Sequence, residues 1–172
     1  MAIDFSIAQL VGMISFAIGI AVFCQKDDRR FKILMVVLQL NHVLHFVLLG
    51  SLVSAMSALI SAVRTVTAIY VSTKLVAAVF ICFGLATGIW LADSLWDLWP
   101  IFGTVAGTYS IFMLSGIRMR IGFLIGSGCW LINNITVGSI GGTLLEITMI
   151  CVNVMTIYRL NREQNQILVI DN

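Results

Sequence analysis

Four ionisable side chains lie inside long apolar runs of this sequence, and they have the clearest chemical potential. Arg64 and Glu146 have opposite charges, and His42 and His45 are three positions apart. Inside a membrane such groups face the bundle interior or a wet cavity, where they bind solutes or carry protons. We expect Arg64 to meet an anionic or carbonyl group. If the protein moves a solute across the membrane, protonation of a histidine or of Glu146 could couple that movement to protons.

Arg64 and Glu146 are also predicted to interact, because each is the only embedded partner of opposite fixed charge for the other. Such a pair could bind a solute, fix the packing of the helices, or do both. The histidines have a similar alternative, since buried polar side chains often only hydrogen-bond neighbouring helices.

An aromatic surface with two amides beside it forms a second candidate group. Trp130 precedes Asn133 and Asn134 by about one helical turn. An indole face with an amide at that spacing suits a small flat or polyhydroxylated solute. The alternative is an interfacial tryptophan with an asparagine that caps a turn.

The sequence gives little reason to expect an enzyme. It has no Walker loop and no convincing pair of nucleophile and base, and His42 with His45 lacks a third metal ligand apart from Glu146. The four cysteines have no CxxC spacing and lie in or beside apolar runs, which is typical of buried thiols. We predict no catalytic residue, no metal, no cofactor and no nucleic-acid partner.

The elements that must position these groups are transmembrane helices. Hydrophobic residues make up 60% of the 172 positions and charged residues only 10%, whereas soluble domains contain about 25% charged residues. The apolar runs are longer than barrel strands. No basic segment precedes the first run, 5–24, and no clear cleavage site follows it, so we expect a retained span. The expected fold class is an all-α polytopic membrane protein in a lipid bilayer.

Seven spans account for the apolar runs. The runs 33–71 and 121–158 would each reach about 57 Å as one helix, nearly twice the hydrocarbon core, so each must fold back. Gly50-Ser51 and Gly138-Ser139 are the expected turns. Residues 75–92 form another span, and Pro100 opens the fifth helix.

Basic residues predict the orientation of these spans. Nine of the ten fall on one side of the membrane: Lys26, Arg29, Arg30, Lys32, Lys74, Arg118, Arg120, Arg159 and Arg162. By the positive-inside rule that side is the cytoplasm, so the amino terminus is outside and the carboxyl terminus is cytoplasmic.

An offset of 88 residues superimposes landmarks of the first three spans on the last three. Gly19 falls on Gly107, and the turn Gly50-Ser51 falls on Gly138-Ser139. We predict two parallel three-helix repeats and a linker helix, a 3+1+3 arrangement, with a site near the midplane where the repeats meet. The predicted units are a first repeat (1–71), a linker helix and outer loop (72–99), a second repeat (100–158) and a cytoplasmic tail (159–172).

Three segments resemble the YgjV-like family of bacterial inner-membrane proteins: CQKDDRRFK at 24–32, SAVRTV at 61–66 and CWLINNITVGSIGGTLLE at 129–146. The resemblance covers almost the whole chain and implies the bacterial inner (plasma) membrane, without implying an activity. More distantly, the 3+1+3 layout resembles the superfamily of SWEET sugar carriers, PQ-loop proteins and PnuC-type vitamin transporters. Trp130 with Asn133 or Asn134 resembles the pocket residues of those carriers, but the Pro-Gln motif is missing.

These observations favour a carrier for a small polar metabolite, passive or coupled to an ion. The residues expected to line its central pocket are Arg64, Glu146, His42, His45, Trp130, Asn133 and Asn134. The alternative is a membrane sensor or binding scaffold that transports nothing. The sequence is compatible with a monomer and with a homo-oligomer.

Overall fold

The computed structural model describes residues 6–23, 28–71 and 73–170, and all regular secondary structure within them is helical. The helices are α1 (Ile7–Phe23), α2 (Asp28–Leu48), α3 (Leu52–Tyr70), α4 (Lys74–Leu91), α5 (Leu98–Met113), α6 (Gly116–Thr136) and α7 (Ile140–Ile170), with a short 3-10 helix, η1 (Leu95–Asp97), before α5. The predicted all-α class and seven long helices are confirmed. Pro100 lies in the first turn of α5, where its missing N–H breaks no helical hydrogen bond.

Length and hydropathy agree with a membrane protein. α3, α4 and the segment Ile140–Arg162 of α7 are each long and apolar enough to cross a membrane, and Ile7–Val22 and Ile33–Leu48 are shorter apolar stretches. Large apolar side chains also cover the outside of the bundle, most clearly on α4, where Trp90 is 83% exposed. A surface of this kind is stable against lipid and unfavourable in water.

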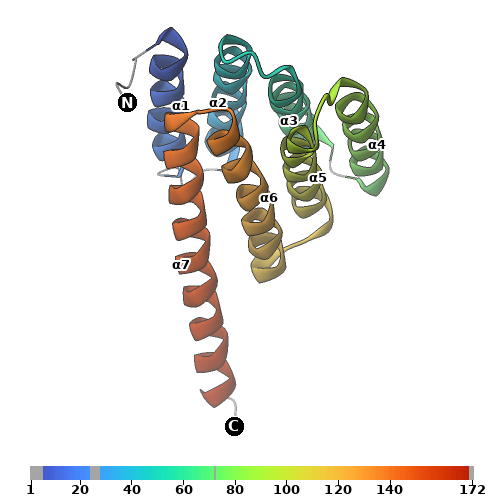
Figure 1. Ribbon diagram of the computed structural model, residues 1–172. Coiled ribbons are helices and arrows are strands. Elements are labelled where there is room, and N and C mark those ends of the chain that lie inside the picture. The colour runs from blue at the N-terminus through green and yellow to red at the C-terminus, as the bar shows by residue number, and fades with distance from the viewer. Residues whose placement is uncertain (1–5, 24–27, 72, 171–172) are drawn as a thin grey trace.

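The principal helix contacts form a ring. α1 packs on α2, α2 on α3, α3 on α5, α5 on α6, α6 on α7, and α7 returns to α1. α4 stands outside this ring and packs on both α3 and α5 (Figure 1). α7 has 31 residues and extends past the other helices at its carboxyl end (Figure 1).

Two matching glycine turns lie at one end of the bundle, which we call the glycine-turn end. Gly50 and Gly138 have φ of +76° and +72°, a left-handed conformation that favours glycine. After each glycine, a serine N–H closes the preceding helix: Ser51 donates to Phe46 O at 2.9 Å, and Ser139 donates to Asn134 O at 2.8 Å. Both predicted turns are therefore confirmed.

Glycines allow the helices of the ring to approach closely. A Cβ at Gly141 would overlap the backbone of Gly12, so α7 and α1 meet main chain to main chain. In the same way, a Cβ at Gly103 would lie 3.2 Å from the carbonyl oxygen of Gly126, where α5 meets α6. Small residues at helix contacts are typical of membrane bundles.

The cysteines differ in part from the prediction. Cys82, Cys129 and Cys151 are free thiols, but Cys82 and Cys151 are exposed on the bundle surface, so the prediction of buried thiols is wrong for these two. A thiol behaves as a small apolar group and is tolerated against lipid as well as inside the protein. Cys24 and Lys26, which also entered the predictions, lie outside the described residues.

Candidate functional site

His45 joins three helices at the glycine-turn end. Its ring is fully buried, with Nδ1 2.7 Å from Ala8 O and Nε2 2.7 Å from Ser139 Oγ. A carbonyl oxygen can only accept, so Nδ1 carries a proton. The Ser139 hydroxyl can then donate to Nε2. Both ring nitrogens are thus occupied in holding α2 against α1 and α7.

Gln9 of α1 strengthens the same contact. Its Nε2 donates to Gly138 O at 2.6 Å, and its Oε1 accepts from the backbone N–H of Ile140 at 3.1 Å. One side chain therefore spans the turn between α6 and α7. The sequence reasoning missed this residue, because a glutamine near a helix start gives no signal of its partner.

His42 lies one turn from His45 on α2 and begins an aromatic row across the bundle. The His42 and Phe46 rings are 5.6 Å apart, and Phe46 stacks on Trp130 of α6 with 5.7 Å between centroids. Trp130 in turn covers Gly103 of α5, where an added Cβ would lie 2.7 Å from Trp130 Cδ1. His42 Nε2 is buried and has no hydrogen-bond partner.

The two asparagines of α6 point to different neighbours. Asn133 Oδ1 accepts from Ser54 of α3 at 2.8 Å, whereas Asn134 Nδ2 donates to Trp130 O at 2.9 Å. In each amide the other polar atom, Asn133 Nδ2 or Asn134 Oδ1, is buried without a partner.

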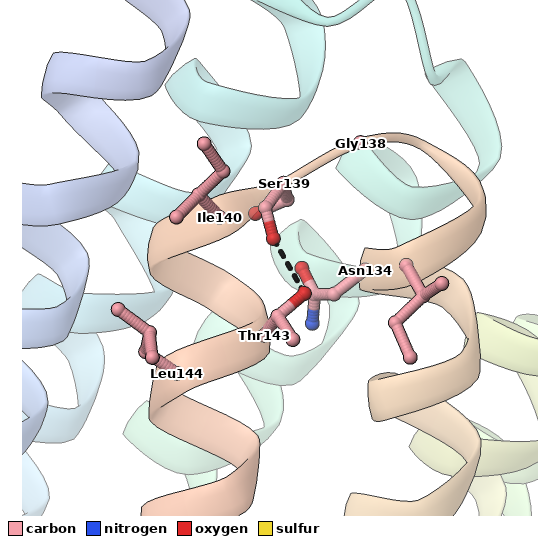
Figure 2. A pocket seen from close by; sticks show the side chains of 7 residues that line it. Asn134, Gly138, Ser139, Ile140, Thr143 and Leu144 are labelled. Atoms are coloured by element: carbon pink, nitrogen blue, oxygen red, sulfur yellow. Dashed lines mark hydrogen bonds between the residues drawn. The ribbon is translucent and has the colours of Figure 1, made fainter. Parts of the chain in front are cut away.

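A hollow of about 300 Å³ opens between α6 and α7 beside Asn134. Figure 2 shows Asn134 directed from α6 toward Thr143, whose hydroxyl donates to Ser139 O at 2.6 Å. The remaining lining is partly apolar: Ile135, Gly138, Ile140 and Leu144. This hollow faces the surface of the bundle and is distinct from the contact between α3 and α5.

Arg64 lies in the contact between α3 and α5, and its side chain is only 4% exposed. Its Nη1 donates to Thr108 Oγ1 at 3.0 Å and to Thr104 O at 3.3 Å, while Nε is buried without a partner. Gly107 gives the guanidinium room, since an added Cβ there would lie 3.1 Å from Nη1.

The predicted pair of Arg64 and Glu146 is wrong. Among the described residues these two side chains form no ion pair: Arg64 bonds to α5, and Glu146 accepts a hydrogen bond from Ser127 of α6. The ring explains the separation, because α3 and α7 are not principal neighbours: α3 packs on α5 and α7 packs on α6. Charge alone could not reveal these neutral partners.

Hydroxyl groups near Arg64 were also missed. Ser54, Ser57 and Ser61 are buried on one face of α3, at the spacing i, i+3, i+7 that continues to Arg64. This helical spacing was visible in the sequence. Serine lowers hydropathy only slightly, so hydropathy alone predicts a membrane span here and does not indicate a polar face.

Five buried polar atoms in the described part of the chain lack a hydrogen-bond partner: His42 Nε2, Arg64 Nε, Thr104 Oγ1, Asn133 Nδ2 and Asn134 Oδ1. They come from α2, α3, α5 and α6, and they include both donors and acceptors. Four of these atoms belong to predicted site residues, and the fifth belongs to Thr104, which was not predicted and which bonds to Arg64 through its carbonyl oxygen. Within the described residues no His, Cys, Asp or Glu side chains are grouped as metal ligands would be.

Comparison with known proteins gives two matches. A family model described as bacterial inner membrane protein matches residues 6–164. The inner membrane protein YgjV of Escherichia coli (strain K12) is 35% identical over 160 residues, which cover 93% of this chain and 87% of that protein. No solved structure matches the chain.

Proposed function

Because the chain belongs to the YgjV family of bacterial inner membrane proteins, we propose that it is an inner-membrane carrier for a small polar metabolite. The five buried polar atoms without partners carry this proposal. An unpaired polar group in a membrane bundle costs free energy, since lipid offers no hydrogen bonds. Five of them from four helices are best explained by a solute or water that binds between the helices.

The helix order supports a carrier built from two parallel repeats, α1–α3 and α5–α7, with α4 as the linker. Each half packs in the order first, second, third helix, and the halves meet twice, α3 with α5 and α7 with α1. The matching turns at Gly50 and Gly138 agree with this relation. Carriers with such repeats bind solutes where the halves meet. The layout resembles that of SWEET, PQ-loop and PnuC-type carriers.

In this proposal all seven helices cross the membrane, with the glycine-turn end outside. Basic residues support that orientation, because Lys74, Arg118 and Arg120 all lie at or near the helix ends opposite the glycine turns. The amino terminus is then outside and the carboxyl terminus cytoplasmic.

Movement of the two halves would have to open the α7–α1 contact, where Gln9 and His45 bridge the halves. Rocking of one repeat against the other is a common way to expose a central site alternately to each side. Gly12 and Gly19 of α1 and Gly103 and Gly107 of α5 are candidates for the bending that prolines provide elsewhere.

The proposal is tested by thermal unfolding of the purified protein with nucleosides, vitamins, sugars and amino acids, followed by uptake into liposomes. A solute that binds only the folded state raises the apparent melting temperature. We expect at least one class to do so, with the shift lost in Asn133→Ala and kept in the lipid-facing control Val79→Ala. Stabilisation without uptake would favour the alternative, a sensor or binding scaffold. Absence of both would contradict the carrier.

A further inference from the structure

Arg64 is a buried charge with incomplete bonding. The guanidinium has five N–H donors, yet its hydrogen bonds to described residues all leave from Nη1 and go to two neutral oxygens of α5. Nε is buried and unpartnered. Arg64 lies about 18 Å along α3 from Leu52, well inside the span.

No acidic side chain among the described residues compensates this charge, since Glu146 bonds to Ser127 instead. A buried cation without a counter-charge is strongly unfavourable in a membrane, and an apolar residue of similar size would be more stable there. A cation in this position therefore points to an anion that is present only part of the time.

Thr104 supplies a second donor beside Arg64. Its carbonyl oxygen accepts from Arg64 Nη1, while its own Oγ1 is buried and unpartnered. A threonine hydroxyl and an arginine N–H can both donate to an anionic oxygen. The two free donors thus belong to residues that already touch across the α3–α5 contact.

The buried serine face of α3 leads to these donors. Asn133, near the glycine-turn end, is bonded to Ser54, and Ser57 and Ser61 continue the same face toward Arg64. Hydroxyl groups can exchange hydrogen bonds with a polar solute without adding a charge of their own. A solute that moves along this face would meet Arg64 as its first fixed charge.

We propose that the carried solute is a small monoanion with a carboxylate group, and that Arg64 and Thr104 bind this carboxylate. The inference rests on the carrier function proposed above and names its class of substrate. One positive charge is neutralised by one carboxylate, whereas a dianionic phosphate would leave excess negative charge in the bundle. Arginine also matches the geometry of a carboxylate through two parallel hydrogen bonds.

The test measures the apparent melting temperature of the full-length protein in detergent. Potassium formate, acetate and propionate are compared with chloride and phosphate at equal ionic strength, with acetamide as a neutral analogue. A ligand added at a concentration of about ten times its Kd should raise the melting temperature by about 3 °C. We expect this shift with at least one carboxylate. It should vanish in Arg64→Gln, shrink in Thr104→Val and partly persist in Arg64→Lys.

Arg120→Gln is the matched control. Arg120 is also an arginine inside a helix, but it is half-buried and bonds to Asn153 of α7 at 3.3 Å. This variant should keep the response to carboxylate. Equal responses of the wild type and Arg64→Gln to every anion would overturn the proposal, and so would equal stabilisation by phosphate, chloride and carboxylates. Thr104→Val keeps Arg64 and therefore tests the site even if Arg64→Gln does not fold.

Uptake of labelled acetate into liposomes separates this inference from the carrier function. A rise in melting temperature with carboxylate, but no uptake, would support the anion site and contradict the carrier function. Uptake of a neutral solute, with no carboxylate response at Arg64, would leave the carrier and overturn the anion site.

Discussion

The two halves of the ring meet at two contacts, α7 with α1 and α3 with α5, and these contacts differ in chemistry. Gly19 of α1 and Gly107 of α5 are equivalent under the 88-residue offset, and each faces a long side chain from the third helix of the other half. At Gly19 that side chain is Leu145, and at Gly107 it is Arg64. The same kind of position is thus filled once by a hydrocarbon and once by a charge.

The surroundings of the two contacts differ in the same sense. Leu145 is buried with Val22 and Leu38 in an apolar cluster, and the polar residues near the α7–α1 contact, Gln9 and His45, are bonded at both ends. Around Arg64, polar atoms are left without partners. The described polar groups are therefore better paired at the α7–α1 contact than around Arg64, and the proposed anion site at α3–α5 accounts for this difference.

The largest effect is expected from placing a charge in the apolar contact. Leu145→Arg would bury a guanidinium against Gly19 and in an apolar cluster with Val22 and Leu38, in contrast to the oxygens that α5 offers to Arg64. We expect a loss of about 4 kcal/mol, enough to prevent recovery of folded protein. Size-exclusion chromatography of detergent extracts would measure the folded fraction.

Leu145→Met is the control, because it nearly conserves volume and should cost less than about 1.5 kcal/mol. If Leu145→Arg were recovered as well as this control, the claimed difference between the two contacts would be lost.

A smaller loss is expected from His45→Ala. The change removes two buried hydrogen bonds, one to Ala8 O and one to Ser139 Oγ, and leaves Ser139 Oγ only its bond from the Gly142 N–H, at a cost of about 2 kcal/mol. His42→Ala should cost less, because His42 Nε2 has no bond to lose. Thermal unfolding of both variants in the same detergent shows which of the two loses more stability. The reverse order would assign the structural role to His42.

The outline of this molecule could be predicted from the sequence because it depends on local properties. The length of the apolar runs predicts the helices, and the glycines at 50 and 138 predict the turns, since few other residues adopt a left-handed conformation. Partners could not be predicted in this way. His45 bonds to a backbone carbonyl 37 positions away and to a hydroxyl 94 positions away, and neither oxygen carries a charge or a periodic signal.

The wrong pairing of Arg64 with Glu146 has the same origin. Opposite charge was the only signal in the sequence for the partners of these two residues, whereas the partners in the structure are a threonine hydroxyl, a carbonyl oxygen and a serine. A bundle can satisfy part of a buried charge with neutral groups. Candidate residues could therefore be found from their type and their position inside the apolar runs. Which of them contact one another could be found only from the packing order of the helices.

The smallest expected effect has the opposite sign and is the most informative. Arg64→Leu would make the α3–α5 contact resemble the α7–α1 contact, where leucine covers the equivalent glycine. Without added solute we expect the variant to be more stable than the wild type by roughly 1 kcal/mol, because an uncompensated buried charge is removed. Thermal unfolding in detergent would measure the change, with Arg120→Leu run in parallel. A merely structural arginine predicts a loss instead, since its two hydrogen bonds to α5 would disappear. A lower melting temperature for Arg64→Leu would therefore mean that both contacts serve stability alone.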